Sequence, residues 1–292
     1  MVRRVKRNMS DKTSDIRLLP RCYPQLLLPI RPGMKDTPEY KNTVLRGEAV
    51  SGDAPRYAPE GSLTVAETPA GPVRILWLAR REDFEHALRA LAYRCEPREI
   101  PPSVGASTVL GLINWEKIRA HEAAYRAAGG EDWAEEFRRF TADAKNYRDT
   151  LIILSNGNYS AVAAEELGLA PEVWTEKSLT IRKYHELTHF ICRNLFPDDV
   201  DAIRDEILAD LIGLTAAFGV YDPALARRFL GIEDGHYRPG GRLSHYAEES
   251  ALPAAVARAE ELIGRYARRM PSDPVPIGEV FDLLLRLFPD RR

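Results

Sequence analysis

The sequence predicts an α+β fold with a strand-bearing N-terminal lobe and a helical C-terminal lobe. Of its 292 residues, 45% are hydrophobic and 29% are charged, the composition of a globular protein long enough to bury a sizeable core. Short strand-like segments separated by glycine and proline turns fall before residue 155, and nearly all later segments carry apolar residues at helical spacing. These two patterns indicate lobes of different secondary structure.

The N-terminal part alternates short apolar segments with turns. Its first 40 residues are rich in proline and charge without periodicity, which predicts a tail or a segment that wraps the surface. Beyond them, β-branched and apolar runs predict strands, and apolar residues three and four apart predict helices. Strands are expected at residues 43–50, 62–67, 73–79 and 150–154, and helices at 81–93, 115–128 and 132–147.

The C-terminal part reads as helical almost throughout. Its segments repeat apolar residues every three or four positions, the spacing that gives a helix one buried face. Helices are expected at residues 160–167, 175–196, 200–218, 223–230, 247–269 and 277–288.

Charge and composition exclude several classes of protein. The 41 Lys and Arg residues are balanced by 43 Asp and Glu, so a formal charge of −2 provides no positive field for nucleic acid. No apolar run approaches the roughly 18 residues of a membrane span, and Pro24 and Pro29 break the short apolar stretch near the N-terminus, which argues against a secretory signal. Cys22, Cys95 and Cys192 lie too far apart to indicate a disulfide framework. We therefore expect a cytoplasmic protein without a nucleic-acid or membrane partner.

The sharpest chemical signal is an H-E-x-x-H motif. His185 to His189 read H-E-L-T-H inside a credible helix that Pro197 ends. Side chains four apart lie on one face of a helix, so His185 and His189 can bind one Zn²⁺ while Glu186 lies close to a water on the metal. The motif predicts a zinc site.

A second helix is expected to fold back against this one. Residues 196–199 form a short turn, and residues 200–218 resume helical spacing with Asp198 or Asp199 as the expected N-cap. Two helices joined by so short a turn lie antiparallel. Small residues at Gly213 and Ala217 would let them approach closely.

This hairpin brings two carboxylates to the histidines. Counting outward from the turn places Glu206 opposite His189 and Asp210 opposite His185. Glu206 would then be the third protein ligand, with the fourth position left open for water. Asp210 could accept the other ring N–H of His185 and fix its tautomer. The sequence therefore predicts an antiparallel two-helix site for one Zn²⁺ ion.

H-E-L-T-H followed after sixteen residues by E-I-L-A-D resembles the gluzincin, or thermolysin-like, metallopeptidases. The resemblance covers about residues 180–215. It implies that His185, His189 and Glu206 are zinc ligands and Glu186 the general base, with Asp210 supporting the first histidine. It also implies an activity, the hydrolysis of peptide bonds.

Other ligand sets remain open. Asp205 is adjacent to Glu206 but is turned about 100° around the helix, towards Ala209 and Ile212. His245 or His236 could instead complete a three-histidine site.

The later segment 235–246 contains two His-Tyr pairs between glycines and prolines. Gluzincins commonly use a His or Tyr from this region to stabilise the oxyanion, so the resemblance implies this role for His245 and Tyr246, with His236 and Tyr237 close behind. An ordinary solvated loop is the alternative. The predicted strand at 150–159 could likewise be an edge strand that pairs with the substrate backbone, or a core strand.

Together these features predict a zinc-dependent hydrolase, most simply a metallopeptidase acting on a peptide or protein. A narrow-specificity intracellular regulatory peptidase and a non-catalytic, zinc-stabilised binding protein are the alternatives. We expect a tail or a surface-wrapping segment at residues 1–40, an α/β lobe at 41–197 that carries the H-E-x-x-H helix, and a helical lobe at 198–292 that supplies the third ligand. The sequence does not indicate an oligomeric state.

Overall fold

The chain divides into two compact units. The computed structural model describes residues 16–50, 55, 57–197 and 201–287. The first unit runs to Glu67 and adds Pro72–Ile100 and Ser107–Ser155, and the second comprises Thr68–Gly71, Pro101–Ala106 and the chain from Asn156 onward. The main division thus follows Ser155, whereas the sequence suggested a boundary after residue 197. The helix with the H-E-x-x-H motif belongs to the same unit as the helix that follows it.

Residues 16–46 are helical and packed rather than a tail. Leu19, Tyr23 and Met34 have no exposed surface, so this segment contributes to the core of the first unit. Of the two alternatives, a tail or a surface-wrapping segment, the tail is therefore wrong from residue 16 onward, and residues 1–15 lie outside the described residues. The segment contains the short helices η1 (Ile16–Leu18), α1 (Leu19–Cys22), η2 (Pro24–Leu27) and η3 (Met34–Asp36) and the longer α2 (Pro38–Arg46).

Helix α2 occupies part of the segment where a strand was expected. The Thr37 hydroxyl caps it by accepting a hydrogen bond from the Tyr40 backbone N–H, and Pro38 stands at its first position. It ends at Gly47, which adopts φ +65°, a left-handed conformation that suits glycine. These end signals outweigh the β-branched residues that suggested a strand at 43–50.

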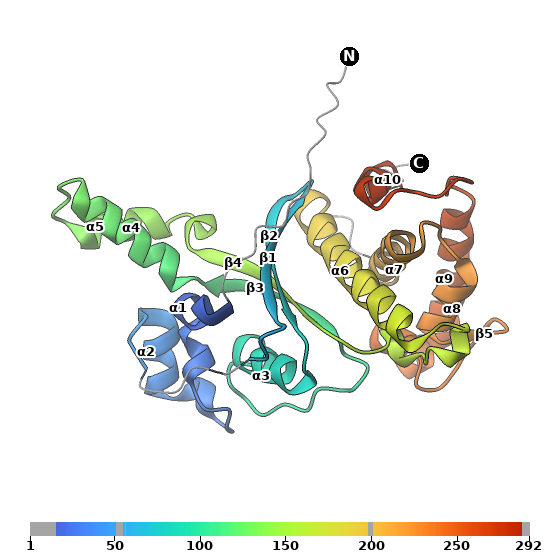
Figure 1. The fold of residues 1–292 in the computed structure, drawn as a ribbon, viewed down its shortest axis with the longest axis horizontal. Helices are drawn as coiled ribbons and strands as arrows, with labels where there is room; N and C mark the ends of the chain where they lie inside the picture. The colour runs from blue at the N-terminus through green and yellow to red at the C-terminus, as the bar shows by residue number, and fades with distance from the viewer. Residues whose placement is uncertain (1–15, 51–54, 56, 198–200, 288–292) are drawn as a thin grey trace, which may run out of the picture. The chain divides into compact units, whose positions relative to one another are not determined.

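A four-stranded sheet forms the centre of the first unit (Figure 1). Strand β2 pairs in parallel with β4, with Arg74 opposite Leu151 and Leu78 opposite Ser155. Because β4 lies between β2 and β3, the core-strand alternative for the segment 150–159 is confirmed and the substrate-binding edge strand is wrong. The strands are β1 (Ser62–Thr68), β2 (Gly71–Leu78), β3 (Ala106–Ile113) and β4 (Arg148–Ser155), in the spatial order β1-β2-β4-β3.

Helix α3 (Arg81–Leu91) packs against β4, and α4 (Trp115–Ala127) is followed by α5 (Trp133–Thr141) and the turn η4 (Ala144–Asn146).

At the start of β4, Asp149 is buried and accepts hydrogen bonds from the Tyr23 hydroxyl at 2.6 Å and the Asn114 amide at 2.7 Å. Arg74 and Lys117 pair with the same carboxylate at 3.1 and 2.7 Å. This ionic cluster ties the N-terminal helices to the sheet.

The second unit is helical apart from one small hairpin. Its two central helices are α6 and α7, and in the part of the chain that the structure describes none of the helices is long and apolar enough to span a membrane. The α+β fold class is therefore confirmed, with the main sheet in the first unit and α-helices in both units. Its elements are η5 (Tyr159–Ala161), η6 (Glu165–Leu167), α6 (Pro171–Leu195), α7 (Ala202–Phe218), α8 (Pro223–Leu230), β5 (Ile232–Glu233), β6 (His236–Tyr237), η7 (Arg242–His245), η8 (Glu249–Ala251), α9 (Leu252–Ala267), η9 (Ile277–Glu279) and α10 (Val280–Leu287).

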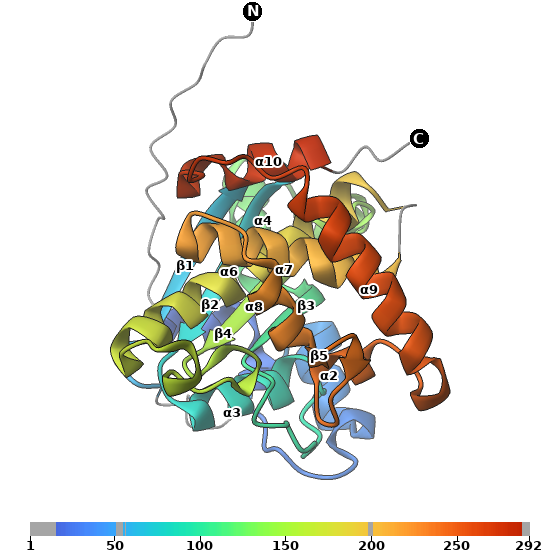
Figure 2. The same ribbon diagram turned by 90° about the vertical axis from the view of Figure 1, so that its right-hand side faces the viewer.

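Helices α6 and α7 lie side by side and antiparallel (Figure 1 and Figure 2). Asp201 caps α7 by accepting hydrogen bonds from the backbone N–H groups of Ile203 and Arg204, whereas the cap was expected at Asp198 or Asp199, which lie outside the described residues. The approach is close at Gly213, where an added Cβ would lie 2.8 Å from the carbonyl oxygen of Ile181. The predicted role of a small residue at Gly213 is thereby confirmed.

Candidate metal centre

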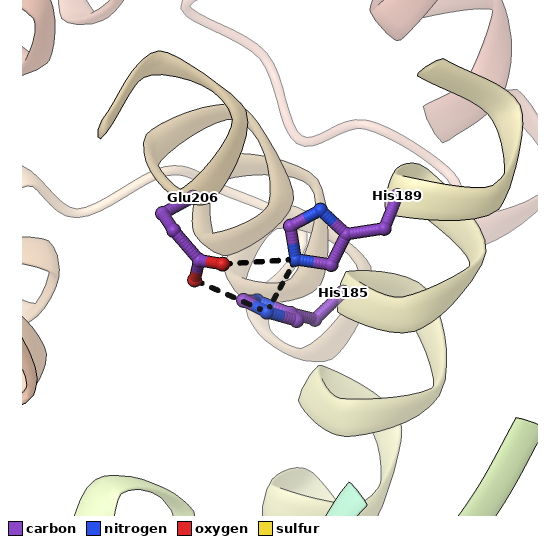
Figure 3. A group of neighbouring side chains, drawn as sticks. All are labelled: His185, His189 and Glu206. Carbon is purple, nitrogen blue, oxygen red and sulfur yellow. Dashed lines mark hydrogen bonds and ion pairs between the residues drawn. The ribbon is translucent and has the colours of Figure 1, made fainter. Parts of the chain in front are cut away.

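Two helices bring three metal-binding side chains together. His185 and His189 lie one turn apart on α6, and Glu206 faces both from α7 (Figure 3). The two Nε2 atoms are 3.0 Å apart, and the Glu206 carboxylate oxygens lie 3.3 Å from His189 Nε2 and 3.5 Å from His185 Nε2. The geometry expected from the antiparallel hairpin is therefore present.

An aspartate on α7 lies within hydrogen-bond distance of the Nδ1 atom of each histidine and so orients the ring. His185 Nδ1 lies 2.9 Å from Asp210 Oδ1, and His189 Nδ1 lies 2.7 Å from Asp205 Oδ2. An ionised carboxylate only accepts hydrogen bonds, so each Nδ1 is the nitrogen that carries the proton. The Nε2 atoms then direct lone pairs toward each other and toward an anionic carboxylate. Such an arrangement is favourable only with a cation or an extra proton between them.

The spacing of the three donors fits a small divalent ion. Ligand atoms bound tetrahedrally to zinc at about 2.0–2.1 Å are separated by about 3.3 Å, close to the distances of 3.0 to 3.5 Å between these side chains. The Glu206 Oε2 atom is buried and accepts no hydrogen bond from the described residues. A buried carboxylate oxygen without a donor is the acceptor that a metal ion would satisfy.

Even without a metal, the surrounding charges favour a positive charge between His185, His189 and Glu206. Burial lowers the pKa of His189, but the hydrogen-bonded Asp205 and Glu206 outweigh it and raise that pKa to about 10. Burial raises the pKa of Glu206, but His189 and His185 outweigh it and lower that pKa to about 2. Without a metal, a proton therefore occupies the position that a cation would fill, so metal binding must release it.

Asp210 is part of a fully buried polar cluster. Its side chain has no exposed surface, and Oδ1 accepts a hydrogen bond of 2.6 Å from the Tyr159 hydroxyl in addition to that from His185. Its other oxygen, Oδ2, pairs with the Arg242 guanidinium. Burial opposes ionisation, but Arg242 and His185 hold the pKa of Asp210 well below its usual value.

A cavity of about 180 Å³ opens beside the cluster within the second unit. Its wall includes His185 and the half-buried Glu186 from α6, and His245 and Tyr246 from the segment after β6. The H-E-x-x-H glutamate, the first histidine and the two residues predicted as oxyanion donors therefore share one space. Residues 103–106 and the η5 turn line other parts of the cavity.

The two predicted donors differ in their surroundings. His245 is exposed, whereas Tyr246 is half-buried. Burial and the nearby Glu206 carboxylate raise the pKa of Tyr246 well above its usual value, against the opposing effect of Arg242. The Tyr246 hydroxyl therefore keeps its proton and can act as a hydrogen-bond donor.

The alternative ligands lie elsewhere. His236 is exposed and its Nδ1 bonds the Asp234 carbonyl at 2.7 Å, while the Tyr237 hydroxyl donates to the Gly241 carbonyl at 2.9 Å. Asp205 points at the Nδ1 side of His189 rather than toward the shared space. Among the described residues, the group whose ligand atoms converge is His185, His189 and Glu206.

Sequence reasoning missed three residues of this cluster. Asp205 was weighed only as an alternative metal ligand, although the register that pairs Asp210 with His185 also brings Asp205 near His189, one turn along α6. Tyr159 and Arg242 come from segments far apart in the chain, and no motif marked either one.

Comparison with known proteins gives a family but no activity. The model of a family of unknown function, DUF7005, matches residues 5–271, so the chain belongs to this family. No curated protein and no solved structure matches the chain.

Proposed function

We propose that this member of DUF7005 is a zinc-dependent hydrolase, specifically a metallopeptidase. The proposal has His185, His189 and Glu206 as metal ligands and Glu186 as the general base. The observation that carries it is that the two histidine Nε2 atoms lie 3.0 Å apart and both face Glu206. An aspartate contacts the Nδ1 atom of each ring and so fixes its orientation.

The set of donor atoms favours zinc. Two imidazole nitrogens and one carboxylate oxygen are typical of catalytic zinc sites, whereas magnesium and calcium prefer oxygen ligands alone. Three protein ligands would leave one of four positions for water or substrate. A purely structural site usually fills all four positions, so the count of ligands favours catalysis.

The place of Glu186 on the cavity wall supports its assignment as the general base. It follows His185 directly in the chain, and its side chain lies on the wall of the cavity that His185 also lines. A bound zinc ion would lower the pKa of water toward neutrality and polarise the scissile carbonyl. Glu186 would accept the proton that this water loses and then deliver it to the leaving amine.

Tyr246 and His245 supply donors for the developing negative charge. Both line the cavity with Glu186, and the Tyr246 hydroxyl remains protonated at neutral pH. A donor placed where charge develops stabilises the transition state more than the ground state. Of the two, Tyr246 is the better candidate, because it is half-buried and the Glu206 carboxylate lies near its hydroxyl, whereas His245 is exposed.

The size of the cavity favours a selective peptidase. Its volume of about 180 Å³ is below the roughly 300–1,000 Å³ of common small-molecule pockets. We therefore expect few peptides in a library to be cleaved, as for a regulatory peptidase with narrow specificity.

Metal analysis combined with peptide cleavage tests the proposal. We expect purified protein to contain one zinc ion per chain and to cleave library peptides in a reaction that a chelator stops and zinc restores. Glu186→Gln should retain zinc but lose about 10²–10⁴-fold in turnover, and Glu206→Ala should lose zinc. Glu176→Gln, an exposed position on the same helix, is the matched control and should behave as wild type.

The outcomes separate the alternatives. Turnover that survives in Glu186→Gln would show that the assigned mechanism is wrong. Zinc binding without cleavage of any peptide or protein would identify a non-catalytic, zinc-stabilised protein. Absence of any bound divalent metal would refute the metal centre itself.

A further inference from the structure

The Arg242 guanidinium joins three separate segments of the second unit. Its Nη1 donates to the Tyr159 hydroxyl at 2.6 Å and to Ser160 Oγ at 3.4 Å, and its Nη2 pairs with Asp210 Oδ2. The guanidinium carbon also lies over the Tyr159 ring, 5.2 Å from its centroid. One side chain thus contacts the η5 turn and α7 from its own place in η7.

These contacts compensate the buried negative charge of Asp210, which bonds the proposed metal ligand His185. Asp210 is wholly buried, and it orients His185 through Nδ1. A buried carboxylate stays ionised only when charges and donors surround it. Arginine keeps its charge at all relevant pH values and presents donors in a planar fork, so Arg242 can satisfy Asp210 and Tyr159 together.

The same contacts hold a strained turn against the cavity. Ser160 and Ala161 have φ values of 50° and 58°, a left-handed conformation that non-glycine residues adopt only when their surroundings impose it. This turn and the segment from Gly240 to Tyr246 both line the cavity. Arg242 bonds the turn from the opposite segment, so it fixes the distance between two walls.

We propose that Arg242 is a positioning residue of the metal centre: it aligns Asp210, and through it His185, and joins the η5 turn to the segment that carries Tyr246. Tyr159 completes the arrangement because its hydroxyl accepts from Arg242 and donates to Asp210. The inference rests on the metal site of the proposed function but does not require that the site be catalytic.

Two variants test this role without relying on activity. Arg242→Lys keeps the positive charge and removes the planar fork, and Tyr159→Phe removes one hydroxyl while the ring keeps its edge-to-face contact with Phe229. Arg238→Lys is the matched control, because that arginine lies in the same region but is 43% exposed and pairs only loosely, at 3.5 Å, with Glu233.

Zinc affinity is measured by competition with a chromophoric chelator, and coordination geometry by the visible absorption of the Co²⁺-loaded protein. We expect the affinity to fall about 10- to 100-fold in Arg242→Lys and about 10-fold in Tyr159→Phe, the range found for residues that orient metal ligands. The Co²⁺ spectrum should change in both variants and remain unchanged in Arg238→Lys.

Wild-type zinc affinity and an unaltered Co²⁺ spectrum in Arg242→Lys and Tyr159→Phe would overturn the inference, even if both variants were less stable. If Arg242→Lys fails to fold, Tyr159→Phe alone decides. A wild-type protein that binds zinc without hydrolysing peptides would refute the proposed activity and leave this inference intact. A wild-type protein that binds no metal would refute both.

Discussion

Replacing Gly213 by alanine tests how closely α6 and α7 approach. An added Cβ would lie 2.8 Å from the Ile181 carbonyl oxygen and 3.1 Å from its Cγ2, whereas ordinary contact begins at 3.4 Å. The backbone oxygen cannot rotate away as a flexible side chain would. The helices must therefore separate locally by about 0.6 Å, the difference between the first and last of these distances.

Two opposing effects set the magnitude. Alanine is favoured over glycine inside a helix by about 1 kcal/mol, and forcing an extra methyl group into a packed interface costs about 1–3 kcal/mol. We expect Gly213→Ala to lower the free energy of unfolding by up to about 2 kcal/mol. Gly264 in α9 is the matched control, since its added Cβ would meet only the end of the Arg268 side chain at 3.5 Å. Gly264→Ala should therefore raise the free energy of unfolding by about 1 kcal/mol.

The difference between the two variants isolates the helix contact because the gain in helix propensity is common to both. Urea unfolding followed by tryptophan fluorescence gives each free energy of unfolding. Separation of the helices would also move Asp210, one turn before Gly213, away from His185, so zinc affinity should fall in Gly213→Ala alone. If Gly213→Ala were as stabilising as Gly264→Ala, the close approach of the two helices would be refuted.

Two further predictions concern buried carboxylates. Asp205→Asn should weaken zinc binding about 10-fold and Asp210→Asn closer to 100-fold. The larger effect is expected at Asp210 because its side chain is fully buried, whereas that of Asp205 is 31% exposed. Zinc affinities measured by chelator competition that rank the two variants in the opposite order would contradict this explanation. Burial opposes ionisation of Asp149, but Lys117 and the hydrogen bonds from Tyr23 and Asn114 outweigh it and lower its pKa. The resulting stabilisation is complete above the unfolded pKa of about 3.9 and is lost as the pH falls through the lower folded value. Asp149→Asn should therefore unfold at a lower urea concentration at pH 7, with a free energy of unfolding reduced by roughly 3 kcal/mol. Between pH 5 and pH 2 this variant should lose less stability than the wild type. An equal loss of stability in both proteins would refute the stabilising role of the ionised Asp149.

Local signals in the sequence predicted the candidate site more fully than the fold around it. The positions of His185, His189, Glu206 and Asp210 depend on helical periodicity and on a short connection, both of which can be counted along the chain. Their roles in binding a metal stay predictions. Gly213 was likewise marked by its size at a helix contact.

Features that depend on pairing between distant segments were not predictable in this way. The run of apolar residues in β4 suits an inner strand as well as an edge strand, and only its pairing on both sides decides between them. The N-terminal helices were predicted only as a tail or a surface-wrapping segment because proline obscures periodicity in short helices, although Leu19 and Tyr23 are completely buried.

The sequence by itself determined which residues share a helix face, because side-chain direction in a helix follows from a fixed rotation per residue. Only the tertiary structure decided that Tyr159 and Arg242 meet Asp210, since these residues are 51 and 32 positions away from it along the chain. Contacts of that kind arise from the packing of whole segments, and no local pattern of residues encodes them. The arrangement around the buried carboxylate, which we infer to position the metal ligands, is therefore a property of the fold.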